Sequence, residues 1–170
     1  YSQMTLTANQ TLYAGWKSQE WSLTFNTNGG SEISPVTVFY GNTVNLSKYV
    51  TKKEGFVFTG WYTDAGCKTK ADEQLTLHSD TALYAGWEVQ KCSLTFLTNG
   101  GVEMDPLSVD YGSTVVLDNF IPVREGYNFI DWYTDSKCTN HAGHQIALKS
   151  DTTLYANWKL KRCKLFFNSN

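Results

Sequence analysis

The sequence reads Leu23-Thr24-Phe25-Asn26-Thr27-Asn28-Gly29-Gly30 in its first quarter, and the same eight residues return with one change as Leu94-Thr95-Phe96-Leu97-Thr98-Asn99-Gly100-Gly101. Apolar and polar residues alternate along the first half of each stretch, which predicts a strand with one buried face. The Asn-Gly step that follows accepts positive φ at both turn positions, so it predicts a tight turn into another strand.

Three further strands are predicted in each copy of this pattern. They cover residues 36–40, 56–62 and 81–87 in the first copy and residues 107–111, 127–133 and 152–158 in the second. Residues 43–53 are less regular: Leu46, Tyr49 and Val50 could form one short helical face, although Pro122 in the second copy limits its length. We therefore expect a short helix or coil between the second and third strands.

A repeat organises the chain, because Trp16, Trp87 and Trp158 lie 71 residues apart and residues 21–87 match residues 92–158 at about half of their positions. The expected divisions are residues 1–17 as the end of a preceding repeat, 18–90 as the first copy, 91–162 as the second copy, and 163–170 as the start of a following repeat. The sequence is therefore expected to be an excerpt from a longer array.

The composition excludes several classes of function. The chain has 170 residues, a formal net charge of -2, and 9 Phe, 6 Trp and 10 Tyr, which suit half-buried strands. So weak a charge predicts no binding to nucleic acid, and without a long apolar run we expect no direct membrane insertion. No charged and then apolar leader is expected at residues 1–5. Asn9 and Asn45 begin glycosylation sequons, which have meaning only in a eukaryotic secretory host.

The recurring residues include the strand and turn quoted above, Tyr40-Gly41, Glu54-Gly55-Phe56-Val57-Phe58-Thr59-Gly60-Trp61-Tyr62-Thr63-Asp64, and Asp80-Thr81-Ala82-Leu83-Tyr84-Ala85-Gly86-Trp87. In this combination the chain resembles the Listeria-Bacteroides repeat family, the internalin B-type B repeats. The resemblance implies an α+β, β-rich fold: tandem small β-grasp, ubiquitin-like modules arranged as an extended array on secreted or cell-surface proteins. It supplies no catalytic residues.

The four cysteines Cys67, Cys92, Cys138 and Cys163 are separated by 25, 46 and 25 residues and permit three pairings. The repeat favours Cys67 with Cys92 and Cys138 with Cys163, because this scheme uses all four, and Trp21 stands where the first copy would have the equivalent of Cys92. Reduced buried thiols remain the alternative, and the paired CxxC spacing of zinc sites is missing. Lasting disulfides would indicate an oxidising, extracellular location and would tie each copy to the next.

Two histidines form a candidate metal site. His141 and His144 are three residues apart, and on a helix this spacing would put both imidazoles on one face. The first copy has Lys70 and Glu73 at these positions. We therefore interpret the histidines as solvated loop residues and expect neither a metal nor a cofactor.

Acidic residues could in principle carry glycosidase chemistry. Asp64 and Asp135 follow the Trp-Tyr-Thr step of each copy and could act with Glu54 or Glu125 as a pair of carboxylates. Turn capping explains each Asp equally well. Because the sequence also lacks a nucleophile elbow, a phosphate loop and a dinucleotide motif, we expect no enzyme and no catalytic residues.

Aromatic pairs are the most specific binding candidates. Trp61 and Tyr62, and Trp132 and Tyr133, are adjacent in predicted strands, so the two rings of a pair point to opposite faces and one could be exposed to stack on a sugar. The alternative is that these rings fill the thin core of a small module.

Repetition and the cysteines together predict a non-enzymatic extracellular tandem-repeat module of a larger surface or secreted protein. It would act as a disulfide-stiffened stalk, an adhesion module, or both. The expected partners are a host or matrix protein or a glycan, besides the neighbouring repeats of the same chain. The alternative hypothesis is a carbohydrate-binding module that uses the Trp and Tyr rings as platforms.

Overall fold

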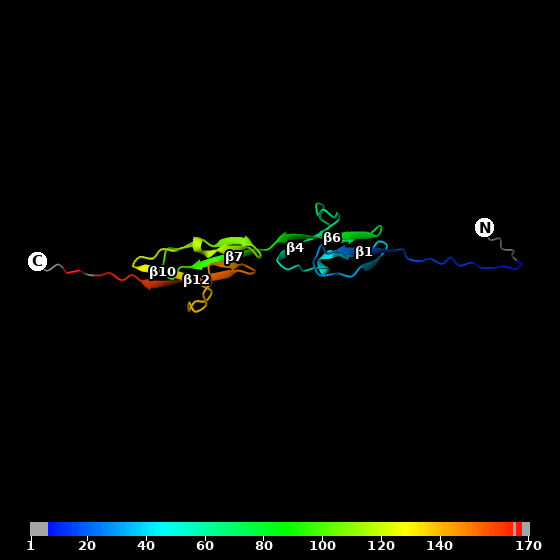
Figure 1. Ribbon diagram of the computed structural model, residues 1–170. Helices are drawn as coiled ribbons and strands as arrows, with labels where there is room; N and C mark the ends of the chain where they lie inside the picture. Colours follow the sequence, from blue (N-terminus) through cyan, green and yellow to red (C-terminus); the bar gives the residue numbers. More distant parts are fainter. Residues whose placement is uncertain (1–6, 165, 168–170) are drawn as a thin grey trace. The chain divides into compact units, whose positions relative to one another are not determined.

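The computed structural model describes residues 7–164, 166 and 167 of the chain (Figure 1). The chain divides into two compact units. Unit 1 contains the residues up to Thr51 together with Gly60–Gly86, and unit 2 contains Lys52–Thr59 together with the residues from Trp87 onward. The segment Lys52–Thr59 therefore belongs to the first repeat by sequence and to unit 2 by packing.

Strands make up nearly all of the regular structure. The first repeat forms β1 (Glu20–Asn26), β2 (Val36–Phe39), β3 (Thr43–Asn45), β4 (Phe56–Tyr62), β5 (Gln74–Thr76) and β6 (Thr81–Val89). The second repeat forms β7 (Lys91–Leu97), β8 (Leu107–Asp110), β9 (Thr114–Val116), β10 (Tyr127–Tyr133), β11 (Gln145–Ala147) and β12 (Thr152–Leu160). The helical pieces in the described residues are two single 3-10 turns, η1 (Leu46–Lys48) and η2 (Leu117–Asn119).

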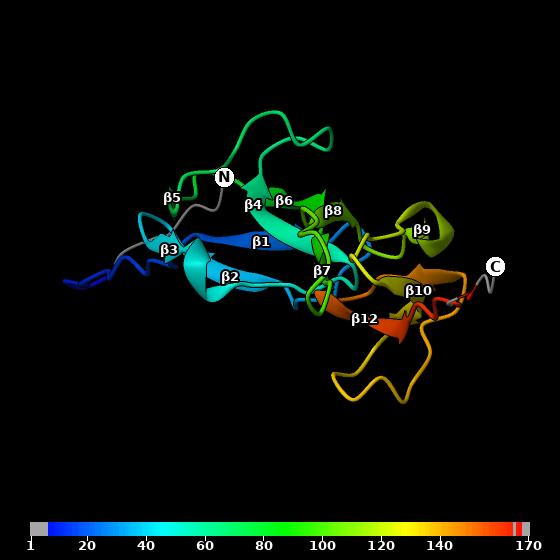
Figure 2. The ribbon, with the colours of Figure 1, turned by 90° about the vertical axis from the view of Figure 1, so that its left-hand side faces the viewer.

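Each repeat builds one four-stranded mixed sheet, with the order β2-β1-β6-β4 in the first and β10-β12-β7-β8 in the second (Figure 1 and Figure 2). The first strand of each repeat lies inside its sheet, antiparallel to the next strand along the chain and parallel to the last one. The ribbons β3-β5 and β9-β11 complete the two repeats. The four predicted strands of each repeat are thus present, with one added ribbon per repeat.

The predicted α+β, β-grasp class is wrong, because the structure is 42% strand and only 4% helical. The difference arises in residues 43–53, for which we expected a short helix or coil. Thr43 and Val44 are β-branched, favour extended backbone, and pair in β3. The Asn45 side chain then accepts a hydrogen bond from Ser47 N at 2.9 Å, which caps one 3-10 turn. A short strand, one 3-10 turn and coil therefore stand where a short helix or coil was expected.

Alternate residues of the central parallel strands form the core of each repeat. Leu23 on β1 and Leu83 on β6 are fully buried, and Leu94 on β7 and Leu154 on β12 are their counterparts. Burial of a Leu side chain stabilises a fold by about 1.5–3 kcal/mol. The alternation that predicted the strands is therefore also what assembles the core.

The Asn-Gly turns have the predicted positive φ. It is 48° at Asn28 and 50° at Asn99, and 85° and 90° at the glycines that follow them. Asn28 Nδ2 donates a hydrogen bond to Ala85 O at 2.8 Å, and Asn99 Nδ2 donates one to Ala156 O at 2.7 Å. Each turn is thereby tied to the last strand of its sheet. Because β2 begins only at Val36, the first turn leads into a connecting segment before the next strand starts.

Candidate functional site

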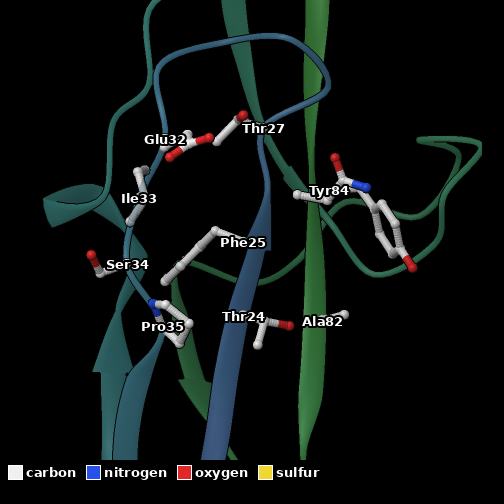
Figure 3. A pocket seen from close by; sticks show the side chains of 10 residues that line it. Thr24, Phe25, Thr27, Glu32, Ile33, Ser34, Pro35, Ala82 and Tyr84 are labelled. Atoms are coloured by element: carbon white, nitrogen blue, oxygen red, sulfur yellow. The ribbon is translucent and has the colours of Figure 1, made fainter.

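A groove of about 640 Å³ opens on unit 1, over the second half of β1 (Figure 3). Figure 3 shows residues 32–35 running beside β1 on one side, with Ala82 and Tyr84 on β6 on the other. The lining combines apolar groups, hydroxyls, one amide and one carboxylate. It consists of Thr24, Phe25, Asn26, Thr27, Glu32, Ile33, Ser34, Pro35, Ala82 and Tyr84.

The groove exists because β1 has a partner strand on only one side over this stretch. β2 pairs with β1 as far as Leu23, which is opposite Val36, whereas β6 pairs with β1 from Leu23 to Asn26. Pro35 immediately precedes β2 and has no N–H with which to continue the antiparallel ladder. The connecting segment therefore diverges from β1, and the groove occupies the space between them.

Trp61 and Trp132, the predicted platforms, are inside the modules, with exposed fractions of 3% and 1%. Their indole nitrogens donate hydrogen bonds to Tyr49 O at 2.7 Å and to Phe120 O at 2.6 Å. The ring of Trp61 also packs against that of Phe25, with centroids 4.9 Å apart. Both tryptophans therefore lie in the cores of their modules, as the alternative interpretation expected. Neither ring is exposed, so neither can serve as a platform for a sugar.

Tyr62 and Tyr133 remain half-buried at the base of a loop in each repeat. Tyr62 forms an isolated antiparallel bridge with Lys70, and Tyr133 forms the matching bridge with His141. The rings of Tyr133 and His141 meet edge to face at a centroid distance of 5.5 Å. Both tyrosines help to close their loops, and their role in ligand binding stays a prediction.

Asp64 and Asp135 organise the loops that follow β4 and β10. Asp64 accepts a hydrogen bond from Thr69 N at 2.7 Å, and Asp135 accepts one from Asn140 N at 2.6 Å, among other backbone amides. These bonds, that of Thr69 or Asn140 foremost, hold the pKa of each carboxyl below its ordinary value. Both side chains therefore have the turn-capping role that sequence analysis gave as an alternative to acid–base chemistry.

A second groove, of about 450 Å³, lies on unit 2 between η2 and β10 and includes His144 in its lining. His144 Nδ1 lies 3.1 Å from Asp118 Oδ1, and this hydrogen bond and charge raise the pKa of His144. His141 Nε2 lies 2.6 Å from Asp131 Oδ2. The two histidines lie off any helix, and each has its own carboxylate partner.

The acidic partners of these histidines, Asp118 and Asp131, were not predicted from the sequence. A signal was available, because the first repeat has Ser47 and Gly60 where the second has Asp118 and Asp131, so acids and histidines appear together in one copy. In the part of the chain that the structure describes, no three His, Cys, Asp or Glu side chains form an arrangement that could hold a metal ion.

All four cysteines are free thiols in the structure. Cys92 lies in the core of unit 2 with 1% of its surface exposed, Cys163 is exposed, and Cys67 and Cys138 are half-buried. Burial raises the pKa of the Cys138 thiol, and the nearby carboxylate of Asp135 adds to the effect. The pairing of Cys67 with Cys92 and of Cys138 with Cys163 stays a prediction.

Comparison with known proteins identifies the family. The Listeria-Bacteroides repeat domain matches residues 21–86 and 93–157, so the chain belongs to the Listeria-Bacteroides repeat family and contains two tandem copies of its domain. The resemblance inferred from the sequence is confirmed.

Two relatives from Evansella cellulosilytica are similar to nearly the whole chain. One, named "Putative membrane protein", is 34% identical over 98% of this chain and 25% of its own length. The other, named "Putative Gly-rich membrane protein", is 33% identical over 94% of this chain and 18% of its own length. The chain thus spans a quarter or less of these relatives. Within residues 7–164, 166 and 167, no helix has the length and apolar character needed to cross a bilayer.

Proposed function

We propose that the chain is a non-enzymatic, extracellular tandem-repeat module of a larger surface or secreted protein, where it acts as a spacer and as an adhesion module. One observation carries this proposal: two copies of one domain follow each other in tandem, at residues 21–86 and 93–157. In a tandem array each repeat contacts only its neighbours, so length can be changed by adding or removing copies, which suits a spacer. The names of the relatives are compatible with a position at the cell surface.

The non-enzymatic character is supported by what the candidate carboxylates do. Asp64 and Asp135 hold the backbone amides of their own loops, including those of Thr69 and Asn140. A carboxylate held in this way, with its pKa lowered, is a poor general acid at neutral pH. The partners we propose are a host or matrix protein or a glycan, together with neighbouring repeats of the same chain, and neither nucleic acid nor a cofactor.

Disulfides are the proposed means of stiffening the array. Cys67 would pair with Cys92, and Cys138 with Cys163, so that each bridge joins one copy to the strand that opens the next. Peptide mapping of the oxidised chain by mass spectrometry should recover these two cross-linked pairs. Small-angle scattering should then show a narrower range of conformations after oxidation than after reduction. Other pairings, or a junction that is equally variable in both states, would exclude the stiffened spacer.

The surface location has a direct test. Antibodies raised against the folded chain should label intact cells of the source organism, and mild protease treatment of those cells should remove the label. Labelling that appears only after permeabilisation would overturn the proposal. Adhesion is tested by binding of the folded chain to arrayed glycans, mucins and matrix proteins, with heat-unfolded chain as the control for nonspecific adsorption.

A further inference from the structure

The groove on unit 1 exposes main-chain hydrogen-bonding groups of β1. Tyr40 N donates to Gln19 O on the β2 side of this strand at 2.8 Å, and Ser22 N donates to Asp80 Oδ1 on the β6 side at 2.8 Å. Main-chain groups alternate between the two sides along a strand. Odd-numbered residues therefore face β2, and the N–H and C=O of Phe25 face the groove.

The wall opposite Phe25 does not use these groups. Pairing between β1 and β2 stops at Leu23 and Val36, and within the described chain no hydrogen bond joins the Phe25 main chain to residues 32–35. Pro35 has no N–H to offer. A strand edge with unpaired groups is a template for another extended chain, and addition of a peptide strand to such an edge is a common mode of recognition.

The side chains around this edge favour one kind of peptide. Glu32 carries the only charge among the lining residues and lies at one end of the groove beside Thr27 (Figure 3). Ile33 and Pro35 continue the wall as apolar groups, and the Phe25 side chain extends from β1 toward this wall. Among the described residues the Glu32 carboxylate has no ion-pair partner, and a carboxylate beside an apolar wall is complementary to a basic side chain next to an apolar one.

We propose that this groove binds an extended peptide segment, which adds its main chain to β1 at Phe25 and places a basic side chain beside Glu32. The interaction is local to unit 1 and does not depend on the surface location or on the spacer role. The partner is defined by its chemistry: an unfolded or exposed strand-forming segment with a Lys or Arg next to a β-branched residue. Because few main-chain bonds are available, the binding is weak for one site and gains from repetition.

The first test uses the full chain labelled with nitrogen-15 and a capped six-residue peptide of alternating valine and threonine with one lysine. Titration should shift the amide signals of β1 and residues 32–35 and slow hydrogen exchange at the Phe25 amide. Two alternately N-methylated peptides separate main-chain pairing from other binding, since successive N–H groups point to opposite edges of an extended chain. Methylation of one edge should weaken binding by about tenfold, and methylation of the other should have little effect.

The second test concerns the negative charge of Glu32. Glu32→Gln should weaken the binding of the lysine peptide roughly two- to fivefold, as expected for the loss of an exposed ion pair. The same substitution should leave the affinity for a peptide with glutamine in place of lysine unchanged. Glu103→Gln, the same change at the equivalent position of the second repeat, is the matched control and should have no effect at the Phe25 amide. Unchanged amide spectra away from the groove confirm that both variants are folded.

Two results would overturn the proposal. One is that no peptide alters exchange at the Phe25 amide, or that both methylated peptides bind as well as the parent. The other is that a neutral oligosaccharide perturbs the same amides at lower concentration than the peptide does, which would make the groove a glycan site. Neither result would affect the cell-labelling test of the spacer, so the two proposals fail separately.

Discussion

The two repeats keep the same side chains where these hold the backbone in place. In each, an asparagine ties its turn to the last strand, a tryptophan donates its indole N–H to a backbone carbonyl, and an aspartate collects loop amides. The residues are Asn28, Trp61 and Asp64 in the first repeat and Asn99, Trp132 and Asp135 in the second. Each of these contacts joins segments distant in the sequence or shapes a loop, so the fold depends on it.

The repeats differ at positions where only the second has further hydrogen-bonding side chains, which contact one another and the backbone. Gly60 and Lys70 in the first repeat become Asp131 and His141 in the second, which form a hydrogen bond. The second repeat thereby gains two histidine–aspartate hydrogen bonds beside a groove without a change in strand order. A tandem array can therefore vary the side chains at its surface from copy to copy while the shared contacts of its Asn, Trp and Asp residues to the backbone stay constant.

The largest expected effect comes from removing the equivalent core tryptophan of each repeat. Trp132→Ala should lower the free energy of unfolding of unit 2 by about 3–5 kcal/mol, because it creates a cavity and leaves Phe120 O without its donor. Trp61→Ala should do the same in unit 1. Denaturant unfolding combined with hydrogen exchange assigned to each unit measures both. A loss below about 1 kcal/mol for either variant would break the equivalence of the two cores.

The next largest loss of stability is expected from alanine substitutions at two equivalent glycines. Gly55 and Gly126 are equivalent, with φ of 76° and 74°. A Cβ at Gly55 would lie 2.5 Å from Tyr111 Cδ1, whereas a Cβ at Gly126 would meet no described atom within 4 Å. Alanine at Gly126 should cost about 1–2 kcal/mol through the left-handed backbone alone. Alanine at Gly55 should cost about 1–3 kcal/mol more through overpacking. Equal costs in thermal unfolding would show that Tyr111 moves aside freely.

The loops whose backbone amides donate to Asp64 and Asp135 should lose stability in acid in both repeats. Because the pKa of Asp135 is lower in the folded chain, its contribution is present above the ordinary carboxyl pKa of about 4 and is lost as pH falls through the folded value. Asp64 should behave alike. The protection factors for hydrogen exchange at the amides of Thr69 and Asn140, which correct for the intrinsic pH dependence of exchange, should fall over that range, and Asp135→Asn should remove this fall at Asn140 alone. A carboxyl that titrates at or above its ordinary pKa would contradict this account.

The smallest effect is confined to the second repeat. Asp118 raises the pKa of His144, so the pair stabilises unit 2 fully below the ordinary histidine pKa of about 6.5, and this contribution is lost as pH rises through the folded pKa. Asp118→Asn should lower the pKa of His144, with the negative charge of Asp131 still acting on it. Nuclear magnetic resonance titration of the imidazole measures the shift. An unchanged His144 pKa in the variant would exclude Asp118 as the cause.

Short-range sequence patterns predicted those strands and turns whose conformation depends on neighbouring residues. The strands around Leu23 and Phe25 and the positive φ at Asn28 follow from alternation and from turn chemistry, both of which a short window of sequence contains. The β3-β5 ribbon could not be predicted in this way, since Thr43 pairs with Thr76 over three-residue strands too short to show a period. The expectation of a short helix or coil over residues 43–53 has the same origin, because the apolar spacing of Leu46, Tyr49 and Val50 does not reveal that residues 43–45 pair with a distant strand.

The candidate sites were less predictable than the strands. Adjacent aromatic residues indicate that one ring could be exposed, but which face of β4 meets the core depends on packing, and Trp61 proved to be buried. The groove beside Phe25 depends on where β2 stops pairing, a property of the sheet and not of any motif. Only Pro35, which cannot donate to a ladder, gave a local sign that pairing would end there.

The hydrogen bonds of the two Asn-Gly turns also bear on the chemical ageing of the chain. An asparagine before glycine loses ammonia when the glycine nitrogen attacks the side-chain Cγ, and the cyclic imide then hydrolyses to aspartate or isoaspartate. Here Asn28 Nδ2 and Asn99 Nδ2 are held by Ala85 O and Ala156 O at 2.8 and 2.7 Å, which fixes both side chains. We expect isoaspartate to form at these positions mainly while a turn is unfolded. Its content in stored protein, measured by mass spectrometry, would then record how much time each repeat had spent open.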